Sequence, residues 1–368
     1  MKKIFLHDFA GHPFQFDLSL HLVKYGYSIV HSFAFQDIGP KANFAIKKQK
    51  LLIAPVKVFF RFNKKKIISR VFWEISYALY LVKLIRHHKP DYVIFSNTPI
   101  LIIIITLFFT PIKYIWWVQD IFSIAALKLE VLPKFFRYFA FKILNFFENF
   151  ISSRSLKIIL ISNSFLPFFI KFSDKVNVIE NWSPICKAYS SRALVGKYLI
   201  YSGTIGEKHS PDMLIQIIYA ALKKGLKFIL VSEGQNADFI KSHFSSFSNF
   251  VGFNFLDSKK LHQLIAQSVG CVVILNKEAS NISVPSKTYT YLRCEIPVLG
   301  IMDKNHDTAN LITRNNFGVI NNFDLFFSRI QDANWLSGFK KRVRAYNKKE
   351  NNTPIKVHQF IKLLEGLN

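Results

Sequence analysis

The chain has 368 residues, 50% of them hydrophobic, and 49 Lys and Arg against 23 Asp and Glu give it a formal charge of +26. This length allows two domains that each bury a core, and this apolar content excludes an intrinsically disordered chain. The charge predicts a polyanionic neighbour, either nucleic acid, an anionic membrane surface or phosphorylated substrates, although an A- and T-rich coding sequence would also favour lysine. The three cysteines lie far apart without metal-ligand spacing, which fits a reducing cytoplasm.

The N-terminal residues predict the start of a doubly wound α/β sheet. An apolar strand from Lys3 to Phe9 leads into the turn Gly11-His12-Pro13, and the helix that follows ends at Gly26. Because His7 and Asp8 interrupt the apolar run, a strand is favoured over a secretion signal. A glycine after the first strand lets a ligand approach the backbone, which makes Gly11 and His12 candidate contact residues. A loop histidine without a role is the alternative for His12.

Residues 56–109 combine basic, aromatic and long apolar segments. A helix is predicted from Ile67 to His87 with one apolar face. That face comprises Ile68, Phe72, Ile75, Leu79, Val82 and Ile85. The segment from Pro99 to Phe109 is the transmembrane candidate, but its run of about a dozen apolar residues falls short of the roughly twenty that a span needs. A buried crossover helix between two strands is the better interpretation.

A carboxylate follows the next predicted strand. Residues 114–118 form this strand, and it ends at Gln119-Asp120. Ligands of open α/β sheets bind at the carboxyl ends of the strands, so Asp120 is a candidate catalytic residue. The alternative is that Asp120 caps the following helix, because Asp is a favoured cap.

The helix predicted over residues 133–150 carries an aromatic stripe. Its members are Phe135, Phe139, Ile143, Phe146 and Phe150, and the cations Lys134, Arg137 and Lys142 lie largely off the stripe. Such a helix can lie in a membrane interface, with rings inserted and lysines at the headgroups. A stripe at helical spacing more often packs on a sheet, so we take the protein core as the default.

A polar and irregular stretch over residues 187–196 marks a domain boundary. We expect an N-terminal domain over residues 1–183, a linker over 184–196, a C-terminal domain over 197–345, and a C-terminal helical segment over 346–368 that packs back on the first domain. In the second domain, strands over residues 198–202, 227–231, 250–253 and 271–275 alternate with helices over 211–223, 236–244 and 258–267.

The segment from Asn276 to Met302 contains a candidate anion site. A polar loop gives way to Pro285-Ser286-Lys287, which opens a short helix. Proline suits the first helical turn, and serine can cap its free amides. Ser286 and Lys287 therefore predict a site for an anion, most naturally a phosphate. A surface helix with a solvated lysine is the alternative.

A second phosphate candidate lies upstream, after the strand that begins the second domain. Gly203, Thr204 and Gly206 form a short loop that can surround a phosphate with backbone amides, and Lys208 supplies positive charge. The alternative for Lys208 is an exposed lysine at the start of a helix.

Five segments, in this order and spacing, resemble the family 4 glycosyltransferases, which have the GT-B fold. They are residues 8–13, 118–123, 178–182, 201–208 and 284–301. The likeness is closest to the bacterial subgroup that builds colanic acid, O-antigen and capsule. It implies an α/β protein with two Rossmann-like doubly wound domains facing each other across a cleft.

The resemblance also implies roles for single residues. Gly11 and His12 would form the acceptor loop, and Asp120 and His12 would take part in catalysis. The donor diphosphate and nucleotide would contact Gly203, Thr204, Gly206, Lys208, Ser286, Lys287 and Thr290. No metal is implied, since such enzymes generally neutralise the diphosphate with basic residues and helix ends.

The chain departs from the family pattern at several positions. The arginine that often follows the loop glycine is replaced by Thr204, and Gln119 takes the position of the usual cleft histidine. Two glutamates spaced eight apart correspond to Ile282 and Thr290 here, so the acidic pair is missing. Glu278 is the nearest carboxylate upstream that could substitute for it.

We therefore expect a retaining glycosyltransferase that is cytoplasmic and peripheral at the inner face of the cytoplasmic membrane. It would transfer a sugar from a nucleotide-diphosphate donor to a lipid-linked or oligosaccharide acceptor in bacterial surface polysaccharide assembly, with no cofactor and no nucleic-acid partner. A nucleotide-sugar epimerase of the same fold is one alternative, although the chain is poor in acid–base carboxylates. A nucleic-acid-binding protein would need a continuous basic groove with stacking rings, and a non-catalytic membrane-associated partner is the third alternative.

Overall fold

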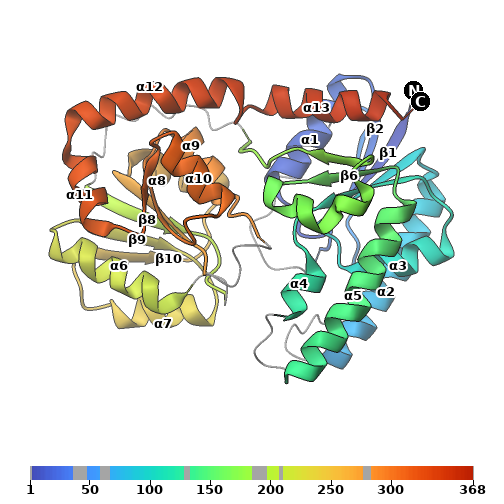
Figure 1. Ribbon diagram of the computed structural model, residues 1–368, viewed down its shortest axis with the longest axis horizontal. Helices are drawn as coiled ribbons and strands as arrows, with labels where there is room; N and C mark the ends of the chain where they lie inside the picture. The colour runs from blue at the N-terminus through green and yellow to red at the C-terminus, as the bar shows by residue number, and fades with distance from the viewer. Residues whose placement is uncertain are drawn as a thin grey trace. The chain divides into compact units, whose positions relative to one another are not determined.

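The computed structural model describes residues 2–35, 48–58, 67–127, 133–184, 197–206, 210–276 and 283–367. The chain divides into two compact units. Unit 1 comprises residues 1–180 and 356–368, and unit 2 comprises residues 181–355. Each unit is a parallel β-sheet with helices between its strands, as expected for Rossmann-like domains (Figure 1).

Unit 1 contains a seven-stranded sheet in the order β3-β2-β1-β4-β5-β6-β7. Its strands are β1 (Lys3–Asp8), β2 (Ser28–Ser32), β3 (Leu51–Ile53), β4 (Tyr92–Ser96), β5 (Tyr114–Val118), β6 (Lys157–Leu160) and β7 (Val176–Val178). Its helices are α1 (Pro13–Lys24), α2 (Ile67–His88), α3 (Ile100–Phe109), α4 (Phe122–Leu127), α5 (Lys134–Arg154), the 3₁₀ segment η1 (Asn163–Phe172) and most of α13 (Thr353–Glu365). The strand order reverses direction between β1 and β4, which defines the place where ligands bind in such sheets.

Unit 2 contains a six-stranded sheet in the order β10-β9-β8-β11-β12-β13. Its strands are β8 (Tyr198–Ser202), β9 (Lys227–Val231), β10 (Phe250–Phe253), β11 (Gly270–Ile274), β12 (Val298–Ile301) and β13 (Gly318–Ile320). Its helices are α6 (Pro211–Lys223), α7 (Gln235–His243), α8 (Ser258–Gln267), α9 (Lys287–Arg293), α10 (Asp307–Arg314), α11 (Phe323–Gln331) and α12 (Ala333–Lys349). The corresponding reversal lies between β8 and β11.

Side chains alternate between the two faces of the unit 2 sheet and build a core on each. On β8, Leu199 and Tyr201 join the core that α6, α7 and α11 cover, whereas Tyr198 and Ile200 join the core under α8, α9, α10 and α12. Figure 1 shows α6 and α7 on one side of these strands and α8, α9 and α10 on the other. Burial on both faces explains why the strands are almost continuously apolar in the sequence.

The apolar segment before β5 forms α3, a crossover helix between β4 and β5, as predicted. Ile102 and Ile103 are fully buried, whereas Phe108 near its end is 83% exposed. No helix in the described ranges has both the length and the apolar character of a membrane span.

The default interpretation of α5 as a core helix is wrong, and the apolar face predicted for α2 is only partly buried. The aromatic stripe of α5 points to solvent instead of into the core, since Phe135 is 75% and Phe146 is 66% exposed. On α2, Val82 and Ile85 of the predicted apolar face are buried, but Phe72 and Leu79 of that face are exposed, and Trp73 and Tyr77 are buried instead. Helical spacing identifies an apolar face but does not say what that face contacts.

Candidate functional site

Lys287 and Gly203, which are far apart in the sequence, meet in unit 2. Gly203 follows β8 with a φ of +115°, a backbone conformation that side-chain-bearing residues rarely adopt. A Cβ atom built on Gly203 would lie 3.2 Å from Lys287 Nζ. The ammonium group therefore lies directly over the glycine backbone, in space that a side chain at this position would fill.

The ammonium group of Lys287 is buried without a counterion in the described part of the chain. Its Nζ has no hydrogen-bond partner among the described residues and lies 3.9 Å from the ring centroid of Tyr201. Burial lowers the pKa of Lys287 to about 7. The ring face stabilises the cation only in part, and an unpaired buried ammonium is costly. This arrangement favours the binding of an anion beside Nζ.

The loop after Gly203 offers backbone donors, as predicted, but the Gly203 amide is not one of them. The Gly203 amide donates to Val231 O at 3.0 Å and is not available to a ligand. The carbonyls of Thr204 and Ile205 accept from Tyr201 Oη at 3.0 Å and from Asn236 Nδ2 at 2.9 Å. Within the described residues, the amides of Thr204 and Ile205 have no acceptor. The loop is thus held by its carbonyls and leaves amides for a ligand.

The start of α9 corrects the prediction that the Ser286 side chain caps the helix. Its side chain makes no cap hydrogen bond, and its backbone is already helical. The amides of Thr288 and Tyr289 donate to the carbonyls of Pro285 and Ser286, so they are not free for an anion. This turn therefore contributes the Lys287 side chain and the amides of Ser286 and Lys287, which have no acceptor among the described residues.

The hydroxyl group of Tyr291 fixes α9 to the sheet. Tyr291 Oη lies 2.9 Å from Ser202 Oγ and accepts from the Ser202 amide at 3.1 Å, which joins α9 to the carboxyl end of β8. Thr290, another predicted contact residue, is half-buried, and its hydroxyl accepts from Ser183 Oγ at 3.3 Å. The position of Lys287 over Gly203 is thus set by hydrogen bonds that the sequence pattern does not reveal.

The Gly203–Lys287 site lies where the strand order of unit 2 reverses, because Gly203 directly follows β8. A hollow of about 590 Å³ opens at the same edge of the sheet, beyond β11 and β12. It is lined by residues that include Met213, Asn276, Met302 and Asp303. The lysine, the loop amides and this hollow together suit a ligand with an anionic group and an extended polar portion.

A second polar site lies at the reversal point of unit 1. Asp8, at the end of β1, is fully buried and accepts from the backbone amides of His12 and, at 3.2 Å, Ala10. His12 Nδ1 lies 3.5 Å from Asp8 Oδ1, and the ring is 33% exposed. Asp8 therefore orients a partly exposed imidazole in the predicted acceptor loop.

Gln15 and Ser96 complete this site. In the orientation of the Gln15 amide that satisfies both of its ends, the nitrogen donates to Asp8 Oδ1 and Oδ2 at 3.0 and 2.8 Å, and the oxygen accepts from Ser96 Oγ. Ser96 ends β4, so the site joins both strands at the reversal point. Asp8, Gln15 and Ser96 were not predicted as site residues, although a carboxylate at the end of a central strand was a usable signal for Asp8.

Two fully buried histidines, His7 and His31, lie on the neighbouring strands β1 and β2. Burial lowers the pKa of His7 to about 3 and that of His31 to about 4. His31 Nδ1 is 2.8 Å from Ser19 Oγ, and His7 Nε2 is 3.5 Å from Tyr77 Oη. Both imidazoles are therefore neutral at pH 7.

The other predicted site residues are placed as follows. Asp120 follows β5 and is half-buried, at the same sheet edge as Asp8 but beyond β4. Gly206 is exposed at the end of its loop, and Gly11 has a φ of +74° in the acceptor loop. Lys208 and Glu278 lie outside the described residues.

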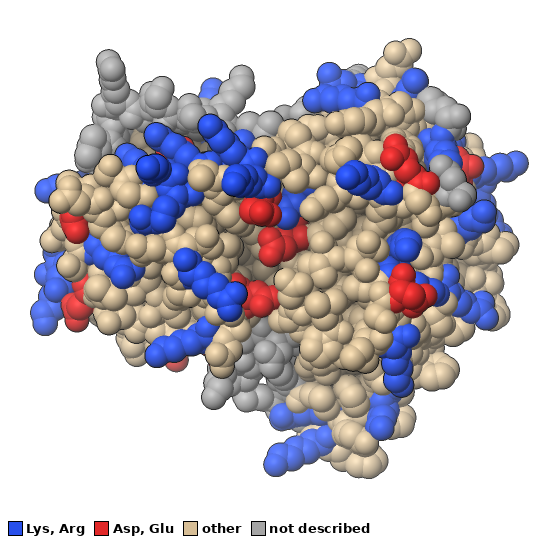
Figure 2. Space-filling model, turned by 45° about the horizontal axis from the view of Figure 1, so that its top comes forward, with Lys and Arg blue, Asp and Glu red and all other residues tan. Residues whose placement is uncertain are grey.

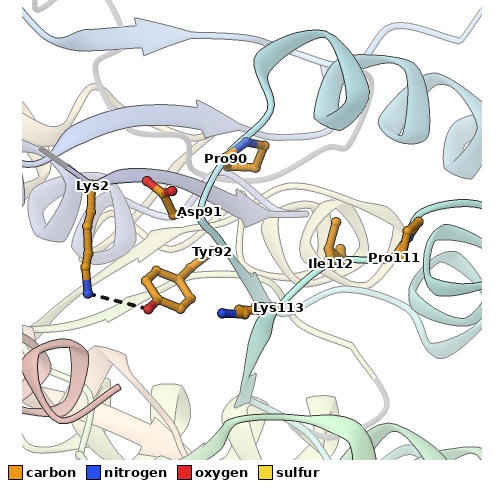
Figure 3. Close-up of a pocket in the computed structure, with 7 residues that line it drawn as sticks. All are labelled: Lys2, Pro90, Asp91, Tyr92, Pro111, Ile112 and Lys113. Carbon is orange, nitrogen blue, oxygen red and sulfur yellow. Dashed lines mark hydrogen bonds between the residues drawn. The ribbon is translucent and has the colours of Figure 1, made fainter. Parts of the chain in front are cut away.

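A further hollow, of about 360 Å³, lies at the opposite edge of the unit 1 sheet (Figure 3). Its lining includes Lys2, Asp91 and Lys113, which precede β1, β4 and β5, and Lys2 Nζ donates to Tyr92 Oη at 3.5 Å. Ligands of open α/β sheets bind at the carboxyl ends of the strands, so this hollow is not the expected site.

No protein family model and no curated protein sequence matches the chain. Solved structures do match it over almost its whole length. A glycosyltransferase from Rickettsia africae has a TM-score of 0.64 at 13% identity, covering 100% of this chain and 98% of that one. S. aureus TarM, in complex with fondaparinux, alpha-GlcNAc-glycerol and UDP, has a TM-score of 0.69 at 11% identity, covering 99% of each chain.

The same architecture occurs in an epimerase. UDP-GlcNAc 2-epimerase from Methanocaldococcus jannaschii has a TM-score of 0.55 at 11% identity and covers 99% of both chains. Identities this low show a common fold and leave the reaction open. With two Rossmann-like domains and whole-length similarity to these glycosyltransferases, the chain has the GT-B fold.

Proposed function

We propose that the protein is a glycosyltransferase and that unit 2 binds the diphosphate of its nucleotide-sugar donor beside Lys287. The observation that carries this proposal is the buried Lys287 ammonium group, which lies over Gly203 and has no partner among the described residues. The amides of Thr204 and Ile205 add hydrogen-bond donors to the same place. The UDP in the TarM complex and the glycosyltransferases among the similar structures support a nucleotide donor.

The chemistry needs positive charge where the leaving group departs. As the bond between the sugar and the diphosphate breaks, negative charge grows on the diphosphate, and preorganised donors stabilise it. The ammonium group of Lys287 is desolvated before the ligand arrives, so its interaction with a phosphate is stronger than that of a solvated lysine. We propose that Lys287, Lys208 and the loop amides supply this stabilisation without a metal cofactor.

Unit 1 would bind the acceptor at the Gly11-His12 loop. The Asp8 carboxylate and the Gln15 amide orient His12, whose partly exposed ring can contact an acceptor hydroxyl group. Asp120 and Glu278 remain our candidates for contacts with the reacting sugar. We propose a retaining reaction, in which the leaving phosphate accepts the proton of the acceptor hydroxyl and no protein nucleophile is required.

We further propose a lipid-linked or oligosaccharide acceptor and a role in bacterial surface polysaccharide assembly, in the family 4 subgroup that builds colanic acid, O-antigen and capsule. The protein would act in the cytoplasm at the inner face of the cytoplasmic membrane. The charge of +26 supports an anionic membrane surface as a neighbour.

A thermal-shift panel of UDP, GDP and ADP tests the donor site, because a ligand that binds only the folded state raises the melting temperature. We expect a uridine or guanosine diphosphate to stabilise the protein, and Lys287→Met or Lys208→Ala to remove most of the shift. Lys223→Met, at an exposed lysine of α6, is the control and should keep the full shift. No response to any nucleotide would contradict the assignment.

The epimerase is the second candidate, since an epimerase shares the fold. Product analysis separates the two: a transferase releases a nucleoside diphosphate only when an acceptor is present, whereas a 2-epimerase converts the nucleotide sugar without one. Nucleic-acid binding has less support: on the part of the face that Figure 2 describes, Asp and Glu side chains lie among the Lys and Arg side chains, and no continuous basic groove is visible.

A further inference from the structure

The outward face of α5 is strongly aromatic. Phe135 is 75%, Phe139 58% and Phe146 66% exposed, and these rings lie on one side of the helix. Phe136, Tyr138 and Ile143 widen this surface, which we call the α5 face. Exposed apolar surface of this extent on one helix is unusual for a protein that contacts only water.

The opposite side of α5 already satisfies the packing of the helix. Ile151 and Ser152 are buried there, and the buried carboxylate of Glu148 accepts from the Ser123 amide at 3.2 Å. This side packs against α3 and α4. The α5 face is therefore not needed for the core that the structure describes, and a role outside that core is required to explain it.

Neighbouring helices extend the apolar surface. Phe72 on α2 is 67% exposed and Phe108 on α3 is 83% exposed. Helix α3 packs against both α2 and α5. Figure 1 shows the first turns of α2 and α5 projecting at the same end of unit 1. Both helices run from the carboxyl edge of the parallel sheet to its amino edge, so these projecting turns lie toward the edge that carries the Gly11-His12 loop.

The charges around the α5 face have one sign. Lys134, Arg137 and Lys142 lie along the helix, and there is no Asp or Glu from residue 134 to 147. On α2, the carboxylate of Glu74 is buried and is paired with Arg70 Nε at 2.7 Å. Figure 2 shows the projecting end at the bottom of the view with blue and tan atoms and no red ones. The apolar surface thus carries an excess of positive charge.

We infer that the α5 face, with Phe72 of α2 and Phe108 of α3, docks on an anionic lipid bilayer. Aromatic rings enter the boundary between headgroups and acyl chains, and the lysine and arginine side chains reach the anionic headgroups. A second copy of the chain is disfavoured as the occupant, because pairing two α5 faces would bring Lys134, Arg137 and Lys142 against like charges. Docking would also hold the Gly11-His12 loop near the lipid surface, and only this last consequence rests on the proposed acceptor.

Vesicle co-sedimentation tests the docking surface. We expect the protein to bind phosphatidylcholine vesicles containing phosphatidylglycerol about tenfold more strongly than pure phosphatidylcholine vesicles, with the difference shrinking in high salt. The double variant Phe135→Ser/Phe139→Ser should lower the partition coefficient by about tenfold or more, since it removes two rings from the apolar contact. Lys134→Gln/Lys142→Gln should reduce the preference for the anionic vesicles.

The matched control is Phe239→Ser/Leu325→Ser, at residues of unit 2 that are 59% and 42% exposed. It should bind vesicles as the unchanged protein does. Every variant should keep its thermal shift with UDP, which shows a folded unit 2 and separates failure of docking from failure of the proposed donor site. Absence of binding to either vesicle, or equal binding by the Phe135→Ser/Phe139→Ser variant, would overturn the inference. A dimer in light scattering that this variant dissociates would also overturn it and assign the face to a second copy.

Discussion

Replacing Lys287 by methionine tests whether its buried ammonium group binds the donor diphosphate. Methionine keeps most of the side-chain volume and removes the charge. In the free protein, burial lowers the pKa of Lys287 to about 7, so at pH 8 about nine tenths of the population is neutral. A diphosphate beside Nζ favours the charged form and raises the pKa again.

Donor binding should therefore take up a proton. At pH 8 the uptake should be about 0.9 protons per ligand, and it should fall toward zero at pH 6, where the free lysine is already charged. In the same range the affinity should weaken by up to about tenfold per pH unit above pH 7 and stay level below it. A nucleotide sugar is the suitable ligand, because its diphosphate has no terminal ionisation near pH 6, unlike UDP itself.

Isothermal titration calorimetry in two buffers of different ionisation enthalpy measures this proton uptake directly. We expect Lys287→Met to bind more weakly at pH 7 and to show no uptake at pH 8, whereas Lys223→Met should behave like the unchanged protein. Equal proton uptake by the Lys287→Met variant would refute the reasoning, because another group would then be the one that titrates.

Further predictions concern stability and the loop glycine. Between pH 7 and 10.5, without ligand, Lys287 is protonated in the unfolded chain but neutral in the folded protein. The free energy of unfolding should therefore rise with pH, by up to about 1.4 kcal/mol per pH unit from pH 7.5 to 9.5. Urea titrations should show a flatter dependence of this free energy on pH for Lys287→Met. His7 and His31 should affect stability at lower pH, because their folded pKa values of about 3 and 4 lie below the ordinary value of 6.5. The unfolded chain then binds more protons than the folded protein, so the free energy of unfolding should fall from pH 6 to 5. His31→Asn should reduce the slope of this free energy against pH by about half. Gly203→Ala should lower the free energy of unfolding by about 1–3 kcal/mol, because alanine is strained at a φ of +115°. It should also abolish the thermal shift with nucleotide, because its Cβ atom would lie next to Lys287 Nζ. Gly225→Ala is the control, because Gly225 has a φ of +75° but a Cβ atom there would meet nothing within 4 Å. This variant should be less stable but should keep the thermal shift with nucleotide. Equal loss of binding in both variants would show that backbone strain alone is responsible.

Most of the alternation of strands and helices could be predicted. Strands that are buried on both faces of a sheet are apolar runs in the sequence, and the helices between these strands show apolar residues at helical spacing. The helix predicted over residues 211–223 is α6 at Pro211–Lys223, and the strand predicted over 198–202 is β8. The GT-B architecture followed from this alternation together with the resemblance, and the similar structures confirm it.

Side-chain surroundings were harder to predict. The stripe of α5 has the spacing of a core helix, yet Phe135 and Phe146 face solvent, because periodicity contains no information about what covers a face. Ser286 was predicted to cap α9 but makes no cap hydrogen bond. The amides of Thr288 and Tyr289, which a cap would bind, donate instead to the carbonyls of Pro285 and Ser286. The network around Asp8 depends on Gln15 and Ser96, which meet only in the folded sheet.

The site itself could be predicted only in outline. Gly203 and Lys287 were both candidates, but their contact depends on the hydrogen bonds of Tyr291 with Ser202, which no spacing in the sequence reveals. The roles of Lys208, Glu278 and Asp120 stay predictions. The outward face of α5 and the buried Lys287 share one property. Exposed aromatic rings and an unpaired buried ammonium group both raise the free energy of the free protein, and binding of a lipid surface or a phosphate would lower it.

A crystal structure with bound UDP would test the donor site most directly. We predict that an oxygen of the diphosphate lies within hydrogen-bond distance of Lys287 Nζ, and that other phosphate oxygens accept from the amides of Thr204 and Ile205. UDP bound away from Gly203, with the ammonium group of Lys287 still unpaired or joined to a protein carboxylate, would contradict the account.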